Sequence, residues 1–91
     1  MELQWSAKAL SGVVRLHEFL LTANRGAAAE VVQALVAAAS RLREHPRIGE
    51  RLEGFETREI RRILVGSYEM RYEVQRSRIY LLRLWHTREH S

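Results

Sequence analysis

The end of the chain carries residue types that could perform acid–base chemistry on RNA. A nearly continuous apolar run over residues 79–85 is followed at once by His86, and Arg88 comes two residues later. Cleavage of RNA by its own 2′-hydroxyl requires a base, a cation beside the phosphate and an acid for the leaving oxygen. Arg61, Arg83 and His86, with Glu50 and Glu53, could supply these groups. The sequence does not show whether these side chains converge.

A binding role requires fewer coincidences of position. Guanidinium groups on one face of a sheet would bind phosphate or carboxylate through paired hydrogen bonds. The candidate target-binding residues are Arg58, Arg61, Arg62, Arg71, Arg83, His86 and Arg88. The opposing interpretation is that these arginines pair with Glu59, Glu69 and Glu73 across strands, which contributes about 0.2–1 kcal/mol a pair. The residue pattern alone leaves the two interpretations equal.

Metal and cofactor chemistry have little support in the sequence. His86 and His90 are four residues apart, but at a strand end this spacing does not put both rings on one face, and no third ligand is near. The chain has no cysteine, which excludes thiolate metal sites and disulfides. It also has no Gly-rich phosphate loop and no nucleophile elbow. We therefore expect neither a metal nor a cofactor.

The composition predicts one small folded domain over residues 1–91. Hydrophobic residues make up 46% and charged residues 29% of the chain, which is ordinary for a globular protein. We see neither a secretory signal nor a run long enough to cross a membrane. The net charge is +4, and residues 46–91 contain ten arginines against seven glutamates. This basic excess predicts an acidic partner, either nucleic acid or protein.

Two helices are predicted in the first half of the chain. Ser6 is placed to cap the first, and the Asn-Arg-Gly turn at residues 24–26 ends it with residues that tolerate positive φ. The second, rich in alanine, should run from about Ala27 to Glu44 and stop before Pro46. The predicted buried stripes are Leu10, Val13, Val14, His17, Leu20 and Leu21 in the first helix, and Val31, Leu35, Ala38, Ala39 and Leu42 in the second.

Strands are expected at residues 3–5 and, after a polar connector over 46–57, at Arg58–Val65, Tyr68–Val74 and Arg78–His86. Short turns separate the last three strands, which indicates antiparallel hairpins. The final strand is apolar at nearly every position, so it should be interior to the sheet. The predicted fold class is α+β. It is a two-layer αβ sandwich of a strand, an α-helical hairpin and a three-strand antiparallel meander.

The order of these elements and several local patterns resemble the RelE/ParE superfamily of bacterial type II toxins. WSAKAL resembles the opening strand and helix start, and LTANRGAAAEVV resembles the helical hairpin. LREHPRIGERL resembles a Leu-x-x-x-Pro-x-x-Gly mark, and REIRRILVGSYEMRYEV and IYLLRLWHTRE resemble the strands that follow. The ordered set, which spans nearly the whole chain, carries the resemblance. It implies that the first strand lies beside the last in an antiparallel sheet backed by the helices.

The resemblance also implies a cytoplasmic protein and a cognate antitoxin, ParD-like or RelB-like, whose C-terminal segment wraps the toxin. RelE-like members cleave mRNA in the ribosome, whereas ParE-like members poison DNA gyrase. RelE-like nucleases usually carry a tyrosine at the end of the last strand, but here Thr87 follows His86. RRILVGSYEMRY and LRLWHTRE look more like ParE and plasmid-stabilisation sequences.

Gyrase inhibition by a protein that is not an enzyme is therefore the preferred function. The alternative is a metal-independent, ribosome-dependent mRNA endonuclease that would use Arg61, Arg83 and His86. A third possibility is a toxin fold that has lost its activity.

Overall fold

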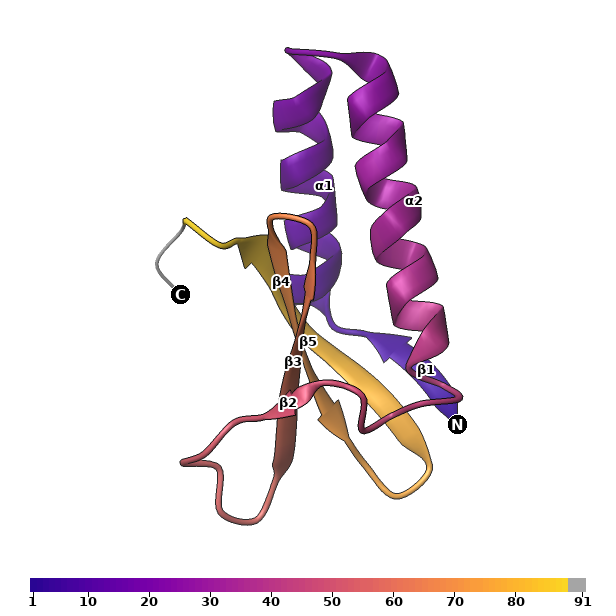
Figure 1. Cartoon of the computed structure of the whole chain (residues 1–91), viewed down its shortest axis with the longest axis vertical. Helices are drawn as coiled ribbons and strands as arrows, with labels where there is room; N and C mark the ends of the chain where they lie inside the picture. The colour runs from indigo at the N-terminus through magenta and orange to yellow at the C-terminus, as the bar shows by residue number, and fades with distance from the viewer. Residues whose placement is uncertain (89–91) are drawn as a thin grey trace.

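The computed structural model describes residues 1–88. The elements follow in the order β1 (Glu2–Trp5), α1 (Ala7–Leu21), α2 (Arg25–Arg41), β2 (Glu50–Arg51), β3 (Glu59–Val65), β4 (Tyr68–Val74) and β5 (Arg78–His86). The helices form an antiparallel hairpin that extends beyond the sheet, and the five strands form one sheet in the order β1-β5-β4-β3-β2 (Figure 1). The predicted α+β architecture is confirmed.

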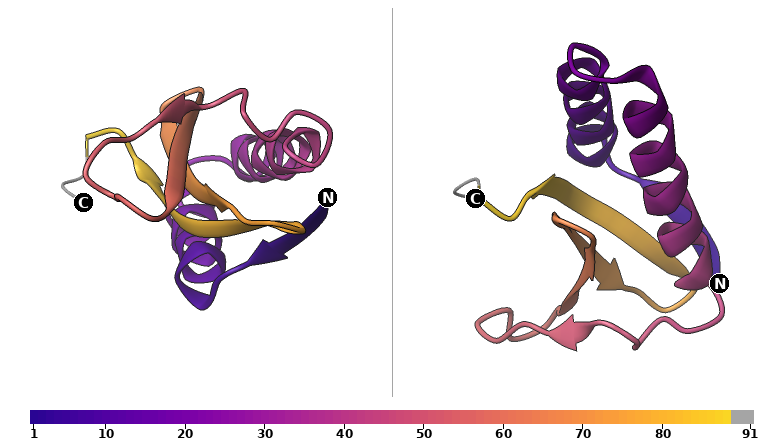
Figure 2. Two further views of the ribbon diagram at one scale, coloured as in Figure 1. Left: turned by 90° about the horizontal axis from the view of Figure 1, so that it is seen from below. Right: turned by 45° about the horizontal axis from the view of Figure 1, so that its top comes forward.

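Strand β1 lies beside β5, as the resemblance implied, but the two strands pair in parallel, so the expectation of an antiparallel sheet is wrong for this pair. The reason is the route of the chain. The helical hairpin returns the chain to the end of the sheet where it began, and the amino group of Met1 donates a hydrogen bond to the carbonyl of Arg43 at 3.4 Å (Figure 2). Strand β2 then runs opposite to β1, the turn after it gives β3 the direction of β1, and two further reversals give β5 that direction again.

The predicted strands of the meander are confirmed almost to the residue. Strands β4 and β5 have the predicted bounds, and β3 begins one residue late, at Glu59. Strand β5 is interior, between β1 and β4. The connector also contains β2, which pairs with β3 and was not predicted. Glu50 and Arg51 are both charged and exposed, so they lack the alternation that predicts a strand.

The turn between the helices differs from the prediction. Helix α2 begins at Arg25, because the Oδ1 atom of Asn24 caps it by accepting a hydrogen bond from the Ala27 amide at 3.1 Å. Gly26 is thus inside the helix rather than in a turn. Among the described residues, positive φ occurs only at Gly54 and Gly66. The helix also ends at Arg41, three residues before the predicted end.

Helix α1 presents a different stripe to the core from the one predicted. Its buried residues are Ala9, Gly12 and Leu16, whereas the predicted core residues Leu10, Val14 and Leu21 are exposed and Val13, His17 and Leu20 are partly buried. The small residues let the helix approach the sheet closely. A Cβ atom on Gly12 would lie 2.6 Å from the Leu84 carbonyl oxygen. For α2 the prediction holds for Leu35, Ala38, Ala39 and Leu42, which are buried, whereas Val31 is partly buried.

Ser6 joins the start of α1 to an irregularity in β5. In the β4–β5 register Arg71 pairs with Arg83 and Tyr72 with Leu81, so Leu82 is the extra residue of a β-bulge. The Ser6 hydroxyl donates to the Leu82 carbonyl at 2.8 Å and accepts from the Ala9 amide at 2.9 Å. One side chain therefore caps the helix, as predicted, and also satisfies the bulge.

Substitution of Ser6 by alanine should destabilise the fold by about 1–3 kcal/mol, because the helix loses its cap and the Leu82 carbonyl loses its donor. Urea denaturation of the variant against the wild type measures the difference. Ser11→Ala, at an exposed position of α1, is the matched control and should be near neutral. Equal stability of the two variants would contradict the double role of Ser6.

Candidate functional site

The predicted site residues fall on two faces of the sheet. Successive side chains of a strand point to opposite faces. On β4, Met70 and Tyr72 are buried toward the helices, and we call this the helix-side face. Glu69, Arg71 and Glu73 lie on the other face, which α1 and α2 do not cover and which we call the open face.

Of the candidate residues, Arg61 and His86 belong to the helix-side face, opposite Tyr72 and Tyr68 in the strand register. Arg62, Arg71 and Arg83 form one row of Cα partners across the open face, and Arg58 joins that face through its ion pair. Arg88 follows the end of β5.

Arg61 holds the connector in place. Its guanidinium donates to Glu59 at 2.7 Å and to the Gly49 carbonyl at 2.7 Å. Beside it, the Tyr72 hydroxyl donates to the Pro46 carbonyl at 2.8 Å and accepts from the Gly49 amide at 3.0 Å. These bonds give Arg61 a structural role between β3 and the segment that follows α2.

The open-face arginines are bound by glutamates that lie between them. Glu69, which is buried, accepts from Arg62 and from Arg71, each at 3.1 Å. Arg62 also donates to Glu50 on β2 at 2.7 Å. Arg62 therefore pairs across strands, as the opposing interpretation predicted, whereas Arg71 pairs with Glu69 within β4. The interpretation that these arginines bind a target stays a prediction.

Two further carboxylates, those of Glu73 and Glu59, link the stability of the fold to pH in the acid range. Paired hydrogen bonds from Arg58 hold the pKa of Glu73 below its ordinary value of 4.5. Burial would raise the pKa of Glu59, but hydrogen bonds from Arg61 and Arg47 outweigh it and lower the pKa below that value. As the pH falls, the unfolded chain therefore takes up these protons before the folded protein does.

The free energy of unfolding should accordingly hold steady near neutral pH and fall as the pH drops below 4.5, through the lowered pKa values of the folded state. Urea denaturation at a series of pH values measures this slope. Glu73→Gln removes one of the two groups and should flatten the curve. A stability that does not change down to about pH 3 would refute this linkage.

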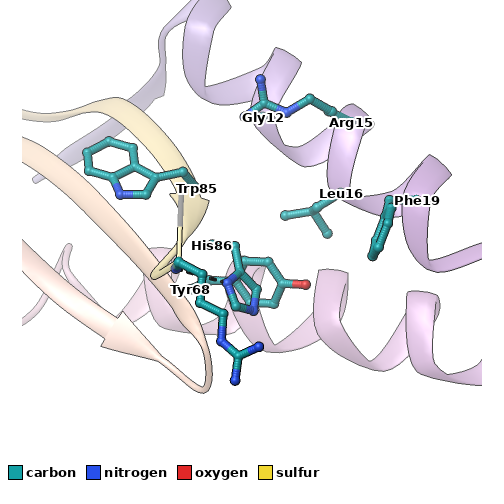
Figure 3. Close-up of a pocket in the computed structure, with 8 residues that line it drawn as sticks. Gly12, Arg15, Leu16, Phe19, Tyr68, Trp85 and His86 are labelled. Carbon is teal, nitrogen blue, oxygen red and sulfur yellow. Dashed lines mark hydrogen bonds between the residues drawn. The ribbon is translucent and has the colours of Figure 1, made fainter. Parts of the chain in front are cut away.

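His86 and Arg88 line a pocket of about 460 Å³ between α1 and the ends of β4 and β5 (Figure 3). Its lining consists of Gly12, Arg15, Leu16, Phe19, Tyr68, Trp85, His86 and Arg88. Leu16 and Phe19 face Tyr68 and His86 across the opening. Phe19 is 73% exposed. The pocket thus has an apolar floor with arginines from two elements beside it, a combination that suits an apolar group next to an acidic one.

The His86 ring is held at the rim of this pocket by two interactions. It meets the Tyr68 ring edge to face, with centroids 5.3 Å apart and planes at 83°. Its Nδ1 atom accepts a hydrogen bond from the Arg88 amide at 3.1 Å, so the neutral imidazole carries its proton on Nε2. The ring therefore also orients the backbone that leads to Arg88.

His86 and Arg88 are predicted from the sequence, whereas the α1 side of the pocket is not. The residues chosen as the buried stripe lie on a different face of α1 from Arg15, Leu16 and Phe19, so these three were not predicted. An aromatic residue that is off the buried stripe of an amphipathic helix was the available signal, and Phe19 is such a residue.

The structure does not bring together the three residues required by the nuclease alternative. Arg61 and His86 pair with Tyr72 and Tyr68, four residues apart on β4, which is a separation of about 13 Å along the strand. Arg83 points to the open face, away from both. One phosphate group could not contact all three side chains in this arrangement.

Within residues 1–88, no three His, Cys, Asp or Glu side chains are grouped to hold a metal ion, and His90 lies outside the described residues. In the same part of the chain, the helices are too short or too polar to cross a membrane.

Comparison with known proteins agrees with this fold. Residues 3–90 match the family described as ParE toxin of type II toxin-antitoxin system, parDE. A chain in the solved structure of a chromosomal ParDE TA system from P. aeruginosa is similar, with a TM-score of 0.78 and 19% sequence identity. The similarity covers 94% of this chain and 95% of that chain. A sequence search of curated proteins gave no match.

Proposed function

This chain belongs to the ParE toxin family of type II toxin–antitoxin systems, and we propose that it inhibits DNA gyrase and thereby blocks replication. The family match over residues 3–90 carries the proposal. A protein with this role acts in the cytoplasm, without a metal or cofactor, and as a binding protein rather than an enzyme.

We also propose that a cognate antitoxin, ParD-like or RelB-like, neutralises the toxin by covering part of its surface. The exposed apolar side chains of α1 support such a partner. Leu10, Val14 and Phe19 are 52%, 56% and 73% exposed, and they lie on the helix that forms one wall of the pocket. Leu10 and Val14 are one turn apart on one side of α1, where neighbouring exposed apolar side chains can mark a protein–protein contact, whereas Phe19 lies at the pocket.

The alternative, a ribosome-dependent mRNA endonuclease, is less well supported by the geometry. Arg61 is occupied in the connector, Arg83 points to the open face, and His86 is at the pocket rim. A gyrase inhibitor needs a complementary surface but no convergent acid, base and cation.

The test is to incubate the purified protein with DNA gyrase and relaxed plasmid, and to run a translating-ribosome mRNA cleavage reaction beside it. Loss of supercoiling with accumulation of cleaved plasmid, while the mRNA stays intact, is the expected result. mRNA cuts at codon sites with gyrase unaffected would reverse the proposal in favour of the endonuclease. Harmless overexpression without antitoxin, with neither reaction affected, would indicate a fold that has lost its activity.

A further inference from the structure

Three arginines occupy neighbouring positions on the open face. Arg62, Arg71 and Arg83 are Cα partners across β3, β4 and β5. Like charges placed directly opposite one another on a sheet are destabilising. Glu69 offsets the repulsion between Arg62 and Arg71 by accepting a hydrogen bond from each. Within the described residues, no ion pair joins Arg83 to a carboxylate. The excess positive charge of the row is therefore concentrated at Arg83.

Trp85 holds the last two arginines in place. The guanidinium carbons of Arg71 and Arg83 lie 4.9 Å and 5.3 Å from the centroid of its ring, and the indole is only 7% exposed beneath them. Cation–π contact holds both side chains in place, so less side-chain conformational entropy is lost when a ligand binds. The Nε atom of Arg71 is buried and has no hydrogen-bond partner in the described part of the chain.

We propose that Arg71, Trp85 and Arg83, which we call the arginine clamp, form the docking point for an acidic segment of the gyrase target. The proposal rests on the function proposed above and gives it a place on the molecule. A carboxylate at this point would neutralise the excess charge of the row and accept hydrogen bonds from the exposed guanidinium of Arg83. Successive side chains of β5 point to opposite faces, so the clamp lies on the open face, whereas His86 and the pocket lie on the helix side.

The surrounding charges favour a protein segment over nucleic acid. Glu50, Glu69 and Glu73 lie among the arginines of the same face, and each is engaged in an ion pair. A duplex carries a closely spaced row of phosphates, which would meet these carboxylates as well as the arginines. A short segment with one or two acidic side chains can reach Arg83 without crossing them.

The experiment measures binding of purified gyrase to the toxin, together with loss of supercoiling, for wild type and Arg83→Gln. The matched control is Arg76→Gln, which removes the same charge from an exposed turn at the other end of β5. We expect Arg83→Gln to weaken binding by about tenfold or more, the contribution of a charge-assisted hydrogen bond, while Arg76→Gln stays near wild type. Arg83→Lys, which retains the charge but loses the planar fork, should be intermediate.

Because Arg83 is exposed, its substitution should leave the fold intact. Thermal melting of each variant checks this. Equal binding by the Arg83→Gln and Arg76→Gln variants would overturn the clamp and leave gyrase inhibition standing. Binding of plain duplex DNA that depends on Arg83 would replace the acidic segment by nucleic acid and also overturn the proposal. If the wild type neither binds nor inhibits gyrase, the proposed function fails, and the clamp fails with it.

Discussion

Replacement of both His86 and Arg88 by alanine is expected to abolish growth arrest by the toxin while leaving its fold intact. Both residues line the pocket, and the Nδ1 atom of His86 holds the backbone amide of Arg88. The double substitution removes the ring from the rim and one of the guanidinium groups beside it. Because neither side chain belongs to the buried core, folding should persist. Growth after induction without antitoxin measures toxicity.

Two controls separate this site from a general loss of charge or of local structure. Thr87→Ala changes the exposed residue between His86 and Arg88 and keeps the backbone amide that donates to the Ser67 carbonyl. Arg76→Ala removes an exposed arginine from the far end of β5. Both control variants should stay toxic, and the double variant should still be bound by a co-expressed antitoxin. A double variant that arrests growth as the wild type does would disprove a role for the two residues in toxicity.

Substitution of Gly12 by alanine should destabilise the fold through a steric clash between α1 and β5. The new Cβ atom would lie 2.6 Å from the Leu84 carbonyl oxygen, and a backbone oxygen of an interior strand cannot easily move aside. Alanine gains about 1 kcal/mol of helix propensity over glycine, but overpacking of this kind costs typically about 1–3 kcal/mol, and here it forces α1 away from β5. We therefore expect a net loss of stability.

Urea denaturation at neutral pH measures this loss. Ser11→Ala on the neighbouring exposed position tests helix propensity without the clash, and it should match or slightly exceed the wild type. A Gly12→Ala protein that is more stable than wild type would show that the helix can shift without cost.

The sequence predicted most of the strands because their patterns are local. The alternation in β4 and the apolar run in β5 are properties of neighbouring residues, and short turns leave only antiparallel pairing between them. The parallel pairing of β1 with β5 depends instead on the path of the helical hairpin between them. The stripe of α1 was misjudged because large apolar residues were assumed to face the core, whereas Gly12 and Ala9 do so to allow close packing.

The candidate site was predictable only in part, because residue types do not reveal their partners. His86 and Arg88 were identified from an abrupt end to an apolar strand, and they share a pocket. Arg61, chosen for the same chemical reason as Arg83, is occupied by the carbonyl of Gly49. That bond depends on the route of a connector that no periodic pattern describes.

The bulge at Leu82 has a consequence for how this chain is aligned with relatives. One extra residue shifts the inside–outside phase of every residue after it, so Leu84 and His86 face the helices while Arg83 and Trp85 face the open side. A homologue that lacks the insertion needs a one-residue gap opposite Leu82. If an alignment omits that gap, it will equate His86 with a side chain on the opposite surface, and conservation measured there will describe the wrong position.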